Sequence, residues 1–153
     1  MEGDPGMLRG YNDYKQTQAS TADKGELLLM LFDGAIRFTI HAIESIDAGD
    51  VIGKCESISR AFAIVAELHG TLDFEVSEEI SGNLASLYVF ILESYTKANA
   101  NHDAMPLDGV LRVLQTLREG WAGAVRATRG ADEQSQNGGT GSATRSALSV
   151  FAG

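Results

Sequence analysis

The sequence predicts an all-α protein: an antiparallel up-down four-helix bundle with a short N-terminal arm and a disordered C-terminal tail. Apolar residues recur at spacings of three and four through long stretches of the chain, which is the helical period. Helix-start and helix-stop residues separate these stretches. Turn dipeptides flanked by alternating apolar residues, the signal of β-hairpins, are missing. Short connections between long helices favour the antiparallel bundle, with boundaries at 1–22 for the arm, 23–128 for the bundle and 129–153 for the tail.

The first helix is expected to run from Asp23 to Ala48, with Asp23 as N-cap and Glu26 completing a capping box. One apolar stripe comprises Leu28, Leu31, Ala35, Phe38, Ala42 and Ile46. A second stripe on another face comprises Leu29, Ile36, Ile40 and Ile43. Because a surface helix needs only one such stripe, this helix must bury a second face against its own chain or against a partner.

Three further helices follow, each with its own start signal. Gly49 is expected to stop the first helix, and Asp50, Ser77 and Asp103 are expected to cap the next three. The core residues expected for these helices are Val51, Cys55, Ile58, Phe62, Val65, His69 and Leu72, then Ile80, Leu84, Leu87, Ile91, Tyr95 and Ala98, then Leu107, Val110, Leu114, Leu117, Trp121 and Val125.

The two ends of the chain differ in composition from the bundle. Leu8, Tyr11 and Tyr14 are spaced three apart in an otherwise polar segment, which predicts a small apolar arm. Residues 133–142 are polar and glycine-rich, with too little apolar surface to offset the entropy of ordering, so the tail is expected to be disordered. The apolar residues at 147–151 leave docking open, although a frayed terminus is the commoner outcome.

Charge and composition exclude several classes of protein. The net charge of −9 repels nucleic-acid phosphates and anionic lipid, so we expect no nucleic-acid binding and no membrane insertion. No apolar run is long enough to cross a bilayer. The N-terminus is acidic where a secretory signal is basic, and a single cysteine, Cys55, rules out an internal disulfide framework. A cytoplasmic protein is the resulting expectation.

No catalytic, cofactor or metal site is predicted. The sequence has no Glu-x-x-His pair for a diiron bundle, and Cys55 has no clustered histidines or cysteines with which to hold zinc. His69 lies on the expected core stripe and suggests a histidine phosphotransfer bundle as one alternative. The residues around it include no cation for a phosphoryl group, so a histidine with a satisfied nitrogen at the bundle edge is favoured. The protein is therefore expected not to be an enzyme.

Together, these features resemble the FliS family of flagellar secretion chaperones. The resemblance covers residues from Tyr11 to Trp121, and its most specific part is the leucine-rich segment that ends Asp33-Gly34-Ala35-Ile36-Arg37-Phe38. The other residues that carry it are 11–17, Gly49-Asp50, 72–76, Asn83-Leu84, Leu87-Tyr88, Ala98-Asn99, Asp103, Leu114, Leu117, Arg118 and Trp121. Phe32 departs from the tyrosine often found there, and Asp23-Lys24 stands where Ser-Pro is common.

The resemblance implies a cytoplasmic export chaperone. No cofactor is expected, and the expected oligomeric state is a monomer or weak homodimer. It would bind the disordered C-terminal segment of flagellin, prevent premature polymerisation and deliver the subunit to the flagellar export apparatus. A structural or adaptor bundle is the other alternative.

We expect the partner to bind surplus apolar surface, because helix-in-groove recognition needs apolar stripes on a rigid scaffold. The N-terminal arm is expected to compete with the partner for that surface. The competing interpretation is that the second stripe of the first helix is only another wall of the core. The expected partner-binding residues are Tyr11, Tyr14, Ile36, Ile40, Ile43, Tyr88 and Leu92.

Overall fold

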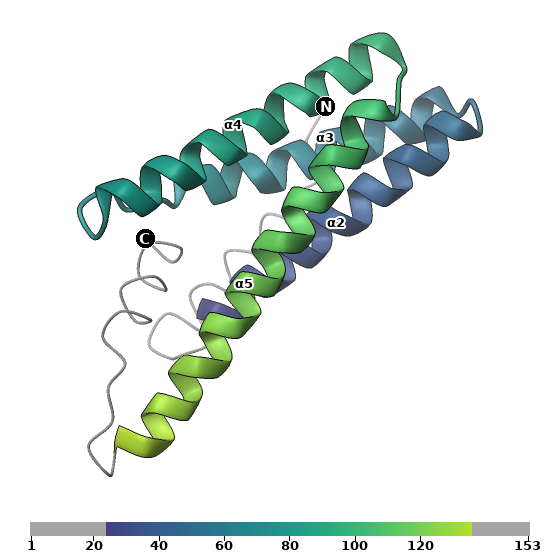
Figure 1. Cartoon of the computed structure of the whole chain (residues 1–153). Helices are drawn as coiled ribbons and strands as arrows, with labels where there is room; N and C mark the ends of the chain where they lie inside the picture. Colours follow the sequence, from purple (N-terminus) through teal and green to yellow (C-terminus); the bar gives the residue numbers. More distant parts are fainter. Residues whose placement is uncertain (1–23, 136–153) are drawn as a thin grey trace, which may run out of the picture.

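The computed structural model describes residues 24–135, and this part of the chain is a bundle of four helices without a strand (Figure 1). The helices are α2 (Lys24–Asp47), α3 (Val51–Gly70), α4 (Glu78–Asn101) and α5 (Met105–Ser135). The predicted all-α class is therefore confirmed. Within the same residues, no helix combines the length and the apolar character that a bilayer crossing requires.

The predicted capping residues Asp50, Ser77 and Asp103 and the predicted stop at Gly49 lie at helix ends in the structure. Asp50 and Ser77 each accept a hydrogen bond from the backbone N–H three residues later, at 2.9 and 3.2 Å. The Asp103 carboxylate accepts one from the N–H two residues later, at 3.0 Å. Gly49 and His102 have φ angles of 73° and 51°, the left-handed conformation that ends helices. Local sequence thus determines where these helices begin and end.

Each helix packs against its neighbours in the chain, and α5 closes the ring by packing against α2. Figure 1 shows α3 and α4 side by side in one direction and α2 and α5 side by side in another. The two pairs are closest at the end that holds the α2–α3 and α4–α5 connections, and they diverge toward the opposite end. That opposite end holds the start of α2, the α3–α4 connection and the end of α5.

The core register of α3 differs from the prediction. Ile58 and Val65 are buried as expected, but Phe62 is 38% exposed. The core positions on its side of α3 belong instead to Ala61 and Leu68. The remaining predicted members that are not buried are Val51, Cys55, His69 and Leu72.

Small residues explain why α3 is rotated about its axis relative to the predicted register, because they let α2 and α3 approach closely. A Cβ added at Gly34 of α2 would lie 3.2 Å from Cδ1 of Ile64 in α3. Ala35 and Ala42 of α2 and Ala61 of α3 are fully buried. A phenylalanine ring does not fit between helices this close together, so α3 turns Phe62 outward.

The registers of the other helices are closer to the prediction. In α4, Ile80 and Leu87 are exposed rather than buried, and Ser81 and Tyr88 occupy core positions in their place. In α5, only Leu117 of the predicted core residues is partly rather than fully buried. In α2, the core includes Phe32 and Thr39, while the predicted Leu31, Phe38 and Ile46 pack partly buried around it.

The predicted tail boundary at residue 129 is too early, because α5 continues to Ser135. Arg129 still faces the bundle, where its guanidinium pairs with the Glu26 carboxylate of α2. The following residues include alanine, glutamate and glutamine, which are good helix formers. Predictions for the arm (1–22), for the Asp23 cap and for residues 136–153 lie outside the described residues.

Candidate functional site

A shallow apolar groove runs between α3 and α4 and is the candidate site. It consists of two adjoining depressions of about 370 Å³ each. Phe62 and Thr96 line both depressions, so the groove is continuous. Its other lining residues are Ile58, Ser59, Leu92, Glu93, Tyr95, Lys97, Asn99 and Ala100. We call this surface the α3–α4 groove.

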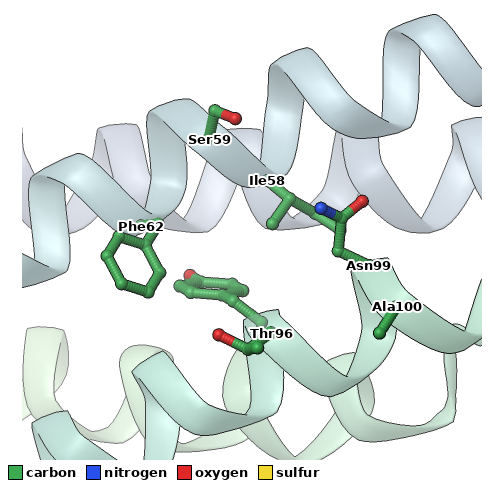
Figure 2. A pocket seen from close by; sticks show the side chains of 7 residues that line it. Ile58, Ser59, Phe62, Thr96, Asn99 and Ala100 are labelled. Atoms are coloured by element: carbon green, nitrogen blue, oxygen red, sulfur yellow. The ribbon is translucent and has the colours of Figure 1, made fainter.

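The groove has an apolar floor and a partly polar rim. Ile58 and Phe62 project from α3 toward α4, and Thr96 and Asn99 line the opposite side (Figure 2). Ile58 and Tyr95 are at most 4% exposed and form the floor, whereas Phe62 stands at the rim. An apolar trough with polar groups along its edges suits the apolar anchors of a helical or extended peptide.

A hydrogen-bond chain fixes the Tyr95 ring in the floor. Thr39 Oγ1 donates its single proton to the Ala35 carbonyl at 2.7 Å, so the Tyr95 hydroxyl is the donor in its 2.7 Å bond to Thr39. Burial raises the pKa of Tyr95 to about 12. These two hydrogen bonds connect α4 to α2 through the core, so they hold the floor of the groove rigidly in place.

The end of the groove near the α4 C-terminus is also held in place. Lys54 is 5% exposed, and its Nζ donates to the Asn99 carbonyl at 3.0 Å. Cys55 Sγ lies 3.6 Å from Asn99 Oδ1. A lysine at the last carbonyls of a helix satisfies free acceptors and complements the helix dipole. These contacts fasten the start of α3 to the end of α4.

Of the predicted α4 residues, Leu92 lines the groove and Tyr88 does not. The expectation that Tyr88 offers free apolar surface is wrong, because it is 1% exposed in the core. The helical period admits either Leu87 or Tyr88 on the core side, and the structure buries the tyrosine. Burial raises the pKa of Tyr88 well above its usual value.

The predicted stripe on α2 lies on a different side of the bundle from the groove. Asp33, one turn before Ile36, pairs with Arg118 of α5 through Nε–Oδ1 and Nη2–Oδ2 distances of 2.7 and 3.4 Å. This side of α2 therefore faces α5. Ile36 and Ile43 are partly buried against the core, and Ile40 is 39% exposed. Tyr11 and Tyr14 lie outside the described residues.

Sequence reasoning missed the residues that shape the groove. The sequence pattern places Phe62 in the core. Asn99 carries part of the family resemblance, but neither Asn99 nor Thr96 is predicted to contact a partner. The available signal was Ala61, because a small residue beside a large one marks the close side of a helix pair.

Sites for other chemistry are not found in the described part of the chain. No group of three or more histidine, cysteine, aspartate or glutamate side chains is placed to hold a metal ion among residues 24–135. His69 lies in the last turn of α3 and is partly exposed. The sequence from 61 to 96 has no lysine or arginine, so the segment around His69 offers no such partner for a phosphoryl group.

Many binding proteins have a four-helix bundle with an apolar groove. Comparison with known families shows to which family this chain belongs. The model of the family described as "Flagellar protein FliS" matches residues 7–128. The chain belongs to the FliS family. The matched region includes α2, α3, α4 and most of α5, and therefore the whole α3–α4 groove.

Curated members of the family align with about 70–80% of this chain. The chain is 30% identical to the flagellar secretion chaperone FliS of Bacillus subtilis over 119 residues, 78% of this chain and 88% of the relative. It is 33% identical to FliS of Salmonella typhimurium over 107 residues, 69% and 79% of the two chains. It is 29% identical to FliSB of Pseudomonas aeruginosa over 120 residues, 76% and 95%. The FliS family consists of flagellar secretion chaperones and not of enzymes.

Proposed function

We propose that this chain is an export chaperone for flagellin and that it holds the C-terminal segment of flagellin in the α3–α4 groove. Membership of the FliS family supports the chaperone role. The observation that supports the location is the groove itself, a continuous apolar trough with Phe62 at its rim. A segment held there is kept from polymerising and is delivered to the export apparatus from the cytoplasm. The chaperone acts as a monomer or weak homodimer.

A rigid groove suits a disordered client for an energetic reason. A segment that folds on binding gives up about 2–5 kcal/mol of interaction energy to ordering. A binding surface that is already ordered adds little to this cost. The buried bond between Tyr95 and Thr39 holds the floor in place before the client arrives.

A second contact surface is proposed on α2, where Ile40 stands beside the partly buried Ile36 and Ile43. This surface extends the client contact beyond the groove. The N-terminal arm, with Tyr11 and Tyr14, competes with the client for these apolar surfaces.

A co-precipitation experiment tests the proposal. The wild-type chain is expected to retain full-length flagellin and to lose flagellin that lacks its C-terminal segment. Phe62→Asp should fail to retain full-length flagellin, because a carboxylate in the groove cannot be desolvated without a partner. Ile52→Asp is the matched control: Ile52 is on α3, is 74% exposed and does not line the groove, so this variant should bind normally. Equal retention by Phe62→Asp and wild type would contradict the groove assignment.

A further inference from the structure

A second exposed apolar surface lies on the other side of α4 from the groove. Ile80, Leu87 and Phe90 are 39%, 36% and 46% exposed. Their spacings of seven and three place them on one face of the helix. Phe90 reaches α5, because its Cζ lies 3.8 Å from where a Cβ on Gly109 would be. The groove residues Leu92 and Thr96 lie on the side toward α3 instead.

The α3–α4 connection, which leads into α4, also exposes apolar side chains. Phe74 and Val76 precede α4 and are 51% and 39% exposed. We call the residues Phe74, Val76, Ile80, Leu87 and Phe90 the α4 edge patch. Several large apolar side chains left exposed near one another mark an interaction surface.

The patch lies in an acidic part of the chain. Residues 61–96 carry six carboxylates and no lysine or arginine. Four of these carboxylates belong to the connection and the first turn of α4, next to the patch: Asp73, Glu75, Glu78 and Glu79. A ligand for this surface should therefore combine apolar side chains with positive charge.

The C-terminal segment of the same chain has this chemistry. In residues 136–153 the one charged side chain is Arg145, and Leu148, Val150 and Phe151 follow it closely. The segment starts at the end of α5, which lies at the end of the bundle where the α2–α5 pair and the α3–α4 pair diverge, so residues 136–144 have to bridge the gap to α4. The nine residues 136–144 can span at most about 30 Å.

We propose that residues 145–151 dock on the α4 edge patch of their own chain. Arg145 lies beside the carboxylates of the α3–α4 connection, and Leu148, Val150 and Phe151 cover Ile80, Leu87 and Phe90. Because the segment is tethered to the bundle that it binds, its effective concentration at the patch is high, and even weak contacts hold it there. The docked segment keeps the patch from pairing with other chains, and a cationic apolar segment of another protein can displace it. The inference does not depend on flagellin binding.

Paramagnetic labelling of the full chain tests this docking. In a Cys55→Ser background, Ser149→Cys carries a nitroxide label, and the loss of backbone amide signals is recorded. We expect the loss to concentrate at Ile80–Phe90. Leu87→Asp should restore these signals, and so should the pair Val150→Asp and Phe151→Asp. Val89→Asp is the matched control, because Val89 is 42% exposed on the opposite face of α4, and it should leave the loss unchanged.

Several results would overturn the proposal. Signal loss that is uniform along the chain means that the segment does not dock. Loss centred on Phe62 places the segment in the α3–α4 groove instead. A further sample mixes nitroxide-labelled chains with isotope-enriched chains that carry no nitroxide. Equal loss of amide signals in this mixture means that the patch binds a second copy of the chain. Circular dichroism of each variant verifies that it is folded, and Arg145→Glu should weaken the docking without affecting the fold.

Discussion

At the scale of single residues, Trp121 joins α5 to the start of α2. It is 1% exposed, and its indole Nε1 donates a hydrogen bond of 2.8 Å to the Gly25 carbonyl. It is also the only tryptophan in the chain. The Trp121 ring thus fills space in the core, and its indole nitrogen forms a hydrogen bond across the contact between α5 and α2.

Replacing Trp121 should separate these two contributions. Trp121→Ala should lower the free energy of unfolding by about 3–5 kcal/mol, because it leaves a large cavity. Trp121→Phe keeps an aromatic ring but loses the donor to Gly25, so it should cost clearly less. Urea denaturation followed by circular dichroism measures both, because the variants have no tryptophan fluorescence. Equal costs for the two variants would show that the hydrogen bond, not the ring, dominates.

The raised pKa of Tyr95 predicts how the free energy of unfolding changes at alkaline pH. Its pKa is 10.0 when unperturbed and rises to about 12 in the folded protein because of burial. Between these values the unfolded chain loses the phenolic proton while the folded chain keeps it. Stability from this group is therefore complete below about pH 10 and is lost as the pH rises toward 12.

The corresponding measurement is the free energy of unfolding between pH 8 and 11 for wild type and Tyr95→Phe. The variant should be less stable at pH 8 by about 1 kcal/mol, because it lacks the bond to Thr39. It should lose less stability than wild type above pH 10. Parallel pH profiles would show that Tyr95 does not ionise on unfolding in this range.

At the scale of helices, the close approach of α2 and α5 requires a glycine at one point. A Cβ on Gly25 would lie 2.8 Å from Cγ2 of Val125, whose branched side chain has little freedom to move. Gly25→Ala should therefore destabilise the bundle. Gly120→Ala is the matched change in α5, where no atom lies within 4 Å of the added Cβ, and it should stabilise by up to about 1 kcal/mol. Thermal unfolding of the two variants should shift in opposite directions.

The local signals of helix structure were readable in the sequence. Asp50, Ser77 and Asp103 cap helices as predicted, because capping depends on residues within one turn. The facing of each helix was less predictable. Periodicity alone admits two neighbouring registers, and the choice between Phe62 and Ala61 depends on how closely α2 approaches α3. That distance is a property of two helices and is not contained in the pattern of one.

At the scale of the whole molecule, the bundle exposes apolar surface on two sides of α4. The α3–α4 groove lies on one side, and the α4 edge patch lies on the other. The sequence predicted that surplus apolar surface exists but placed it mainly on α2, where Ile36 and Ile43 instead pack against the core. Leu92 is the predicted residue that the structure places in the groove.

Calorimetry with a peptide of the flagellin C-terminal segment tests the central claim, that the α3–α4 groove is the client site. Wild type and Ile52→Asp should bind with the same affinity, and Phe62→Asp should bind at least about 30-fold more weakly, the effect of losing a hot-spot residue. Ile40→Asp reports on the α2 surface in the same experiment. Wild-type affinity in a folded Phe62→Asp variant, with binding lost in Ile40→Asp, would contradict the account and place the client on α2.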